Sequence, residues 1–155
     1  MQPNVKPIVQ KADFERVLAT PSRSRSAHFA VHHVSGGPCA SRWQRLHTAE
    51  SKLSTGDAHA GAQPVDDSAR PAPEGCWLGS VVPKRHARRS VTRVLLKRQI
   101  RAAMARHADV LPPGLWVVRL RAPFAVAQFP SAASDALRQA ARAELEQLFG
   151  RARRS

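Results

Sequence analysis

Nine basic side chains lie between residues 84 and 106, and no Asp or Glu lies among them. They are Lys84, Arg85, Arg88, Arg89, Arg93, Lys97, Arg98, Arg101 and Arg106. Cations of this density can neutralise phosphate charge, because no carboxylate within the segment balances them. Arginine, which dominates the set, grips phosphate in a fork and stacks on bases, so it suits folded RNA. The segment therefore predicts a polyphosphate partner.

The whole chain is also basic. Its 155 residues carry a formal charge of +14 and a pI near 11.6, which favours a nucleic-acid partner over a neutral metabolite. Neither paired carboxylates nor a Cys/His cluster has the spacing of a metal or nuclease site, and Cys39 and Cys76 form no CxxC motif. We expect no catalytic residue and no metal ligand in the protein itself.

The sequence also lacks the usual signals for a membrane. No run of about 18 apolar residues predicts a transmembrane helix. Residues 1–10 lack the apolar stretch of a secretory signal, and we find no amphipathic anchor or lipidation motif. A reduced, cytoplasmic protein without a membrane partner is the simplest expectation.

Two predicted elements precede the middle of the chain. Residues 11–19 have Phe14, Val17 and Leu18 at helical spacing, and Pro21 ends this helix. A basic turn at 22–27 leads into a strand over 27–34. On that strand, alternation places Phe29 and Val31 on one face and Ala30 and His32 on the other.

Residues 35–75 differ in kind from the rest of the chain. They are rich in Gly, Pro, Ala and Ser, and they contain few large apolar side chains. Such a composition cannot offset the entropy of ordering. We expect a long, low-complexity, mobile insertion between two strands.

The second half alternates strands and helices. The pattern predicts a strand over 76–82, a helix over 88–107, a strand over 115–120, an irregular stretch or short edge strand over 123–130, and a helix over 131–149. We expect Gly150 to cap the last helix, and residues 150–155 to form a basic tail. The prediction is one RNA-binding domain over 1–155. Its fold would be an α/β (α+β) two-layer sandwich in which helices pack on a small mixed sheet.

The basic helix carries a recognisable motif. Residues 90–101 read SVTRVLLKRQIR, which resembles the signature A-V-x-R-N-x-x-K-R-x-x-R-E of the bacterial ribonuclease P protein component. Arg93, Lys97, Arg98 and Arg101 fall on its four basic positions, and Val91 falls on its Val. The surrounding frame agrees: Asp13-Phe14 lie in an early helix, an aromatic lies in the next strand, and Gly79 precedes Lys84-Arg85. The resemblance covers residues 11–149 apart from the insertion.

The resemblance implies both a fold and an activity. The fold would be ribosomal-protein-S5-domain-2-like, with an unusual left-handed βαβ crossover. The protein would be a subunit of an endoribonuclease whose catalyst is RNA, and Mg²⁺ would be held mainly by that RNA. It would bind ribonuclease P RNA and the 5′ leader of precursor tRNA, promote removal of the leader, and need no obligate protein partner.

The resemblance also implies site residues. The residues expected to bind the RNA subunit are Lys84, Arg85, Arg88, Arg89, Arg93, Lys97, Arg98 and Arg101. Those expected to bind the leader are Phe14, Leu18, Ala30 and His32, with base stacking on Phe14 and the imidazole. Two positions depart from the motif: Val94 replaces its Asn and Ala102 replaces its final Glu. The role of that Asn is therefore in doubt in this chain.

Other interpretations of these residues stay open. A row of charges on a helix is usually a solvated surface, Phe14 could belong to the core, and His32 could have no role. The same fold could serve a non-catalytic RNA-binding or ribosome-associated protein. A DNA-binding regulator would need a second helix directly before residue 88, and a strand is predicted there.

Overall fold

The computed structural model describes residues 4–39 and 75–155, and in them a mixed five-stranded sheet lies with three helices. The predicted insertion at 35–75 falls almost wholly outside the described residues. The elements are β1 (Val5–Pro7), α1 (Lys11–Leu18), β2 (Ser24–Arg25), β3 (Phe29–Val34), β4 (Cys76–Val81), α3 (Ser90–His107), β5 (Gly114–Leu120) and α4 (Asp135–Ala152).

The strands lie in the order β1-β4-β5-β3-β2. β4 is parallel to both β1 and β5, while β3 is antiparallel to both β5 and β2. The expected α/β fold with a small mixed sheet is confirmed. α3 connects the parallel neighbours β4 and β5, so a βαβ crossover is present; its left-handedness stays a prediction.

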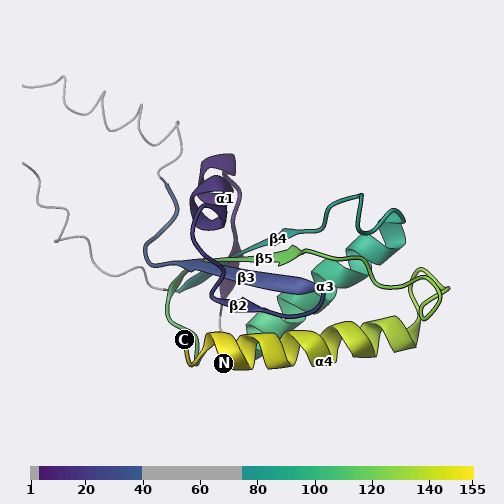
Figure 1. Cartoon of the computed structure of the whole chain (residues 1–155). Helices are drawn as coiled ribbons and strands as arrows, with labels where there is room; N and C mark the ends of the chain where they lie inside the picture. The colour runs from purple at the N-terminus through teal and green to yellow at the C-terminus, as the bar shows by residue number, and fades with distance from the viewer. Residues whose placement is uncertain (1–3, 40–74) are drawn as a thin grey trace, which may run out of the picture.

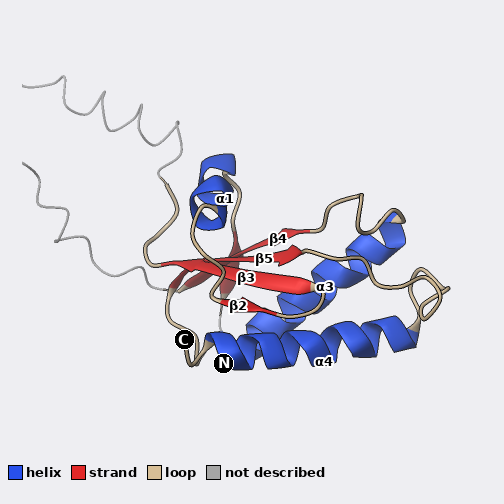
Figure 2. Cartoon of the chain, viewed as in Figure 1, coloured by secondary structure: helices blue, strands red, loops and turns tan. Residues whose placement is uncertain are grey.

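Helices lie on both faces of the sheet. α3 and α4 cover one face and the short α1 crosses the other (Figures 1 and 2). Side chains alternate between the two faces along β5. Trp116 and Val118 pack toward α3 and α4, whereas Leu115 and Val117 pack toward α1. The larger core therefore lies beneath α3 and fixes the orientation of the basic helix.

α1 sits against a glycine in the sheet. A Cβ added to Gly79 would lie 2.3 Å from Cε1 of Phe14, so the absence of a side chain at 79 lets the ring pack on β4. Phe14 and Leu18 are half-buried in this smaller cluster. The position of α1 on the sheet therefore depends on this contact.

Three local expectations were wrong. β1 and β2 were not predicted, and the predicted basic turn contains β2. α4 begins at Asp135, where Ser134 caps it, instead of at residue 131. Residues 123–130 are irregular, which is one of the two alternatives expected there. Gly150 lies inside α4, and Ala152 is fully buried and accepts a 2.6 Å hydrogen bond from Arg23 Nε. Packing against β2 therefore extends the helix beyond the expected cap and incorporates the start of the expected tail.

Among the described residues, no helix has both the length and the hydropathy needed to cross a membrane.

Candidate nucleic-acid interface

The basic segment folds as a loop followed by a helix. Lys84, Arg85, Arg88 and Arg89 lie in the connection from β4, and all four are exposed. In α3, a buried side made of Leu95, Leu96, Ile100, Ala103 and Met104 packs into the core. This burial turns the remaining cations of the helix toward solvent.

The eight cations predicted to bind RNA form no ion pair within the described residues. All of them except Arg93 are exposed. Arg106, at the far end of the same helix, differs because it pairs with Glu146. Positive charge on the loop and on α3 as far as Arg101 is thus left for an external anion.

Arg93 is the exception within the motif. It is half-buried, and its Nη1 donates hydrogen bonds to the carbonyl oxygens of Ala87 at 2.9 Å and Arg88 at 2.7 Å. Charged donors bound to carbonyls hold a loop more firmly than neutral ones. Arg93 therefore positions the loop that carries Arg88 and Arg89, and its predicted contact with RNA stays a prediction.

The other motif cations point in two directions. Lys97 and Arg101 line a hollow of about 360 Å³ beside β1, together with Lys6 and Ser80. Arg98 instead lines a hollow of about 280 Å³ with Val94 and with Arg138 of α4. The cationic surface thus extends from the β1 edge of the sheet across α3, and it stops at α4, where Arg138 pairs with Asp135.

Sequence reasoning missed Lys6. Its side chain lies on the α1 face of the sheet, because the residue pairs with Trp77 of the smaller core cluster. It lies on β1, and its Nζ is 5.6 Å from the ring centroid of Trp77. The strand has only three residues, and no alternation over so short a stretch could have revealed it.

The predicted leader site is only partly accessible. Ala30 is 2% exposed and His32 is 7% exposed, so neither side chain offers a stacking surface. The carbonyl oxygen of Thr20, just after α1, accepts a 2.9 Å hydrogen bond from His32 Nδ1. The expectation that the imidazole is free to stack on a base is therefore wrong, because the end of α1 covers it.

Burial also favours the neutral form of this histidine. Loss of water around the ring lowers the pKa of His32 below 6.5, the hydrogen bond to Thr20 opposes this shift, and the nearby Arg119 and Arg25 lower the pKa further. The neutral ring is thus the stable form near pH 7. His32 adds no positive charge to this face under those conditions.

Two arginines that sequence reasoning missed surround the accessible part of this face. Arg119 of β5 pairs with Ala30, and Ala30 pairs with Arg25 of β2, so the three residues form one row across the sheet. Both arginines are exposed. For Arg119, the sequence did offer a signal, because this arginine is the one charged residue in the apolar pattern of β5. The remaining candidate surface for a strand consists of Phe14 and Leu18 beside these two guanidinium groups.

The fold and these unpaired cations define a class: a small, strongly basic α/β protein whose surface suits a nucleic-acid backbone. A family model described as Ribonuclease P matches residues 3–153, and the chain belongs to that family. The resemblance noted from the α3 motif is thereby confirmed.

Individual relatives agree with this assignment. The chain is 40% identical over 88 residues to proteins named Ribonuclease P protein component from Bordetella parapertussis and Bordetella bronchiseptica. Each alignment spans 57% of this chain and 64% of the relative, less than two thirds of the relative's length. The solved structure of the Staphylococcus aureus RNase P protein matches with a TM-score of 0.54 and 18% identity, covering 95% of this chain and 94% of that one. At this identity the structural match supports the fold alone.

Proposed function

We propose that this chain is the protein subunit of ribonuclease P, and that it promotes the endonucleolytic removal of 5′ leaders from precursor tRNA. It binds the catalytic RNA and the leader, while the RNA performs the cleavage. The observation that carries the proposal is that the eight predicted RNA-binding cations of α3 and its loop form no ion pair within the described residues. The proposal implies a cytoplasmic protein.

The two faces divide the RNA contacts. Lys97 and Arg101, beside the β1 edge of the sheet, bind backbone phosphates of the RNA subunit. On the other face, Phe14 and Leu18 contact leader bases, and Arg25 and Arg119 contact leader phosphates. Stacking on an aromatic ring tolerates any base, which suits leaders of varied sequence.

The Mg²⁺ ions needed for cleavage are bound mainly by the RNA subunit in this proposal. In the described parts of the chain, no three His, Cys, Asp or Glu side chains cluster as a metal ion would require. These residues do not fit a protein-held Mg²⁺, so the proposal assigns the ions mainly to RNA phosphates. Val94, 48% exposed at the motif's Asn position, cannot hydrogen-bond a phosphate or a hydrated ion. Whatever contact that Asn makes in relatives is absent here.

Reconstitution tests the proposal. The chain is mixed with the ribonuclease P RNA of its own genome and a precursor tRNA at low Mg²⁺. We expect cleavage at the leader junction faster than with RNA alone. We also expect less stimulation by Lys97→Ala/Arg101→Ala than by a control of equal charge, Arg142→Ala/Arg154→Ala. Absence of stimulation, with ribosomal RNA copurifying instead, would favour a non-catalytic RNA-binding protein.

A further inference from the structure

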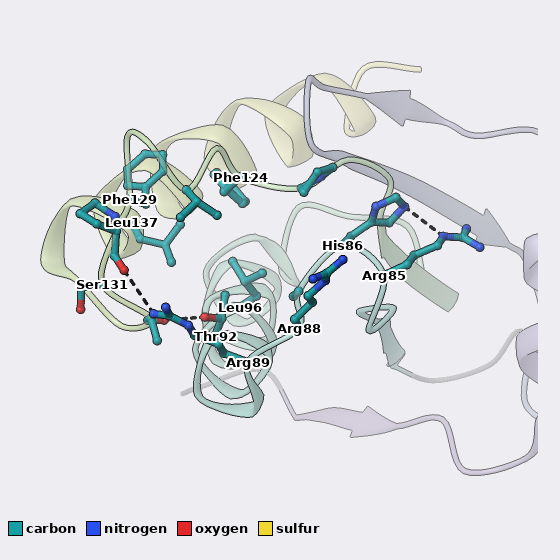
Figure 3. A pocket seen from close by; sticks show the side chains of 15 residues that line it. Arg85, His86, Arg88, Arg89, Thr92, Leu96, Phe124, Phe129, Ser131 and Leu137 are labelled. Atoms are coloured by element: carbon teal, nitrogen blue, oxygen red, sulfur yellow. Dashed lines mark hydrogen bonds between the residues drawn. The ribbon is translucent and has the colours of Figure 1, made fainter.

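A separate pocket lies where the loop before α3 faces the chain between β5 and α4. Its cavity volume is about 330 Å³. Arg88, Arg89 and Thr92 lie on one side, and Phe124 and Phe129 lie on the other (Figure 3). Neither predicted set of site residues included these two aromatic rings.

Hydrogen bonds hold the two walls of this pocket in place. Arg89 Nη1 donates to the carbonyl oxygen of Pro130 at 3.2 Å, and Thr92 Oγ1 donates to that of Ala132 at 2.7 Å. Both bonds join α3 and the residue before it to the opposite wall. The pocket is therefore formed before any ligand arrives, which lowers the entropy cost of binding.

The aromatic wall is supported from behind. The ring of Phe124 stacks on His28 at a centroid distance of 3.9 Å and meets the edge of Phe129 at 5.8 Å. His28 is in turn fixed by Glu144, which accepts hydrogen bonds from its backbone N–H and from Nδ1, both at 2.7 Å. The rings are thus held in position beside the cavity.

The chemistry of the lining identifies the ligand. The interior is apolar, with Leu96 and Leu137 beside the two rings. The rim carries arginines, and none of the described residues that line the pocket is acidic. A flat base suits the interior and a phosphate suits the rim. The volume lies at the lower end of small-ligand pockets, about 300 Å³, and so suits one nucleotide better than a duplex.

We propose that this pocket receives one unpaired nucleotide of a bound RNA strand, with its base among Phe124, Phe129 and Leu96 and its phosphate at Arg88 and Arg89. The identity of the strand rests on the proposed function, but the chemistry of the pocket does not. Occupancy would let the protein recognise an unstacked position in an otherwise paired RNA.

A thermodynamic cycle between the base and the pocket tests the proposal. The probes are a single-stranded RNA pentamer and the same pentamer with an abasic central position. The wild-type chain should bind the abasic pentamer about 10-fold more weakly, as expected when one stacked base is lost. Ser131→Trp fills the pocket without changing charge, and it should bind both pentamers alike. Ala127→Trp, on the same loop but outside the lining, should retain the wild-type difference.

Two further measurements show whether a change in binding comes from the pocket or from loss of folding in a variant. Thermal melts compare the three proteins. In the wild-type chain, a pentamer with a central 5-bromouridine should cross-link under ultraviolet light to residues 122–134. Absence of this cross-link, or the same abasic difference in Ser131→Trp as in the wild type, would overturn the proposal.

The same binding measurements distinguish an RNA nucleotide from other occupants of the pocket, and failure of this proposal from failure of the proposed function. UMP that binds as tightly as the pentamer would point to a free-nucleotide site and overturn the proposal. Self-association abolished by Ser131→Trp would assign the pocket to a second copy of the chain and also overturn it. Because the cycle uses no catalytic RNA, a positive cycle with failed reconstitution would reject the proposed function and leave the pocket in place.

Discussion

Arg93 shows that a motif residue can act on its own chain. The sequence places it in a row with Lys97 and Arg101, and all three have the same charge and helical spacing. Its hydrogen bonds go to carbonyl groups of the preceding loop, whose course no periodicity describes. The residue types at the interface were predictable from the sequence, but the separation of positioning residues from free cations required the loop's conformation.

This separation predicts different effects on stability. Arg93→Ala should lower the free energy of unfolding by about 1–2 kcal/mol, because two hydrogen bonds from a charged donor are lost. Lys97→Ala should change it by less than about 0.5 kcal/mol, since its side chain is exposed and no ion pair with it occurs in the described residues. Urea unfolding of both variants measures the difference. Equal effects would contradict the positioning role of Arg93.

His32 gives a prediction about pH. Its folded-state pKa is lowered from 6.5, chiefly by burial, so folding favours the neutral ring. Its contribution to stability is complete above pH 6.5 and is lost as pH falls from 6.5 through the folded pKa. His32→Asn keeps a donor toward Thr20 but cannot titrate.

The melting temperature of the wild type should therefore fall more between pH 7.5 and 5.5 than that of His32→Asn. Circular dichroism measures both proteins. His33, whose pKa burial also lowers, is present in both and cancels from the comparison. Parallel curves would show that His32 does not titrate in this way.

At the scale of elements, strong local patterns predicted α1, α3, α4, β3, β4 and β5, because each contains enough residues to show a period. β1 and β2 have three and two residues, and they exist because β4 and β3 offer them partners. The end of α4 was wrong for a related reason. The propensity of Gly150 to end a helix was outweighed by the burial of Ala152 and its contact with Arg23.

Gly150→Ala tests the observed end of α4. No atom of the described residues lies within 4 Å of a Cβ at this position, and the residue is helical without a positive φ. Alanine should raise the free energy of unfolding by about 0.5–1 kcal/mol, because it favours the helix more than glycine does. Chemical denaturation is the measurement. A loss of stability would indicate that the residue serves as the cap that the sequence suggested.

At the scale of the whole molecule, the sheet separates two cationic surfaces. α3 and its loop present one surface, and Arg25 and Arg119 present the other beside α1. Composition predicted a nucleic-acid partner from the charge of +14. It could not place the charges, because their arrangement depends on which sheet face each element covers. Because the chain belongs to the Ribonuclease P family, the surface on α3 is interpreted as the proposed binding surface for ribonuclease P RNA.

The salt dependence of binding to ribonuclease P RNA tests this account most directly. Association constants are measured over a range of salt concentrations for the wild type, for Lys97→Ala/Arg98→Ala/Arg101→Ala, and for an equal-charge control, Arg142→Ala/Arg153→Ala/Arg154→Ala. Each lost phosphate contact should reduce the log–log slope by about 0.7–0.9, so the α3 variant should lose about 2–3 in total. The control should keep a slope close to the wild type. An unchanged slope for the α3 variant would contradict the assignment of α3 as the surface that binds the RNA.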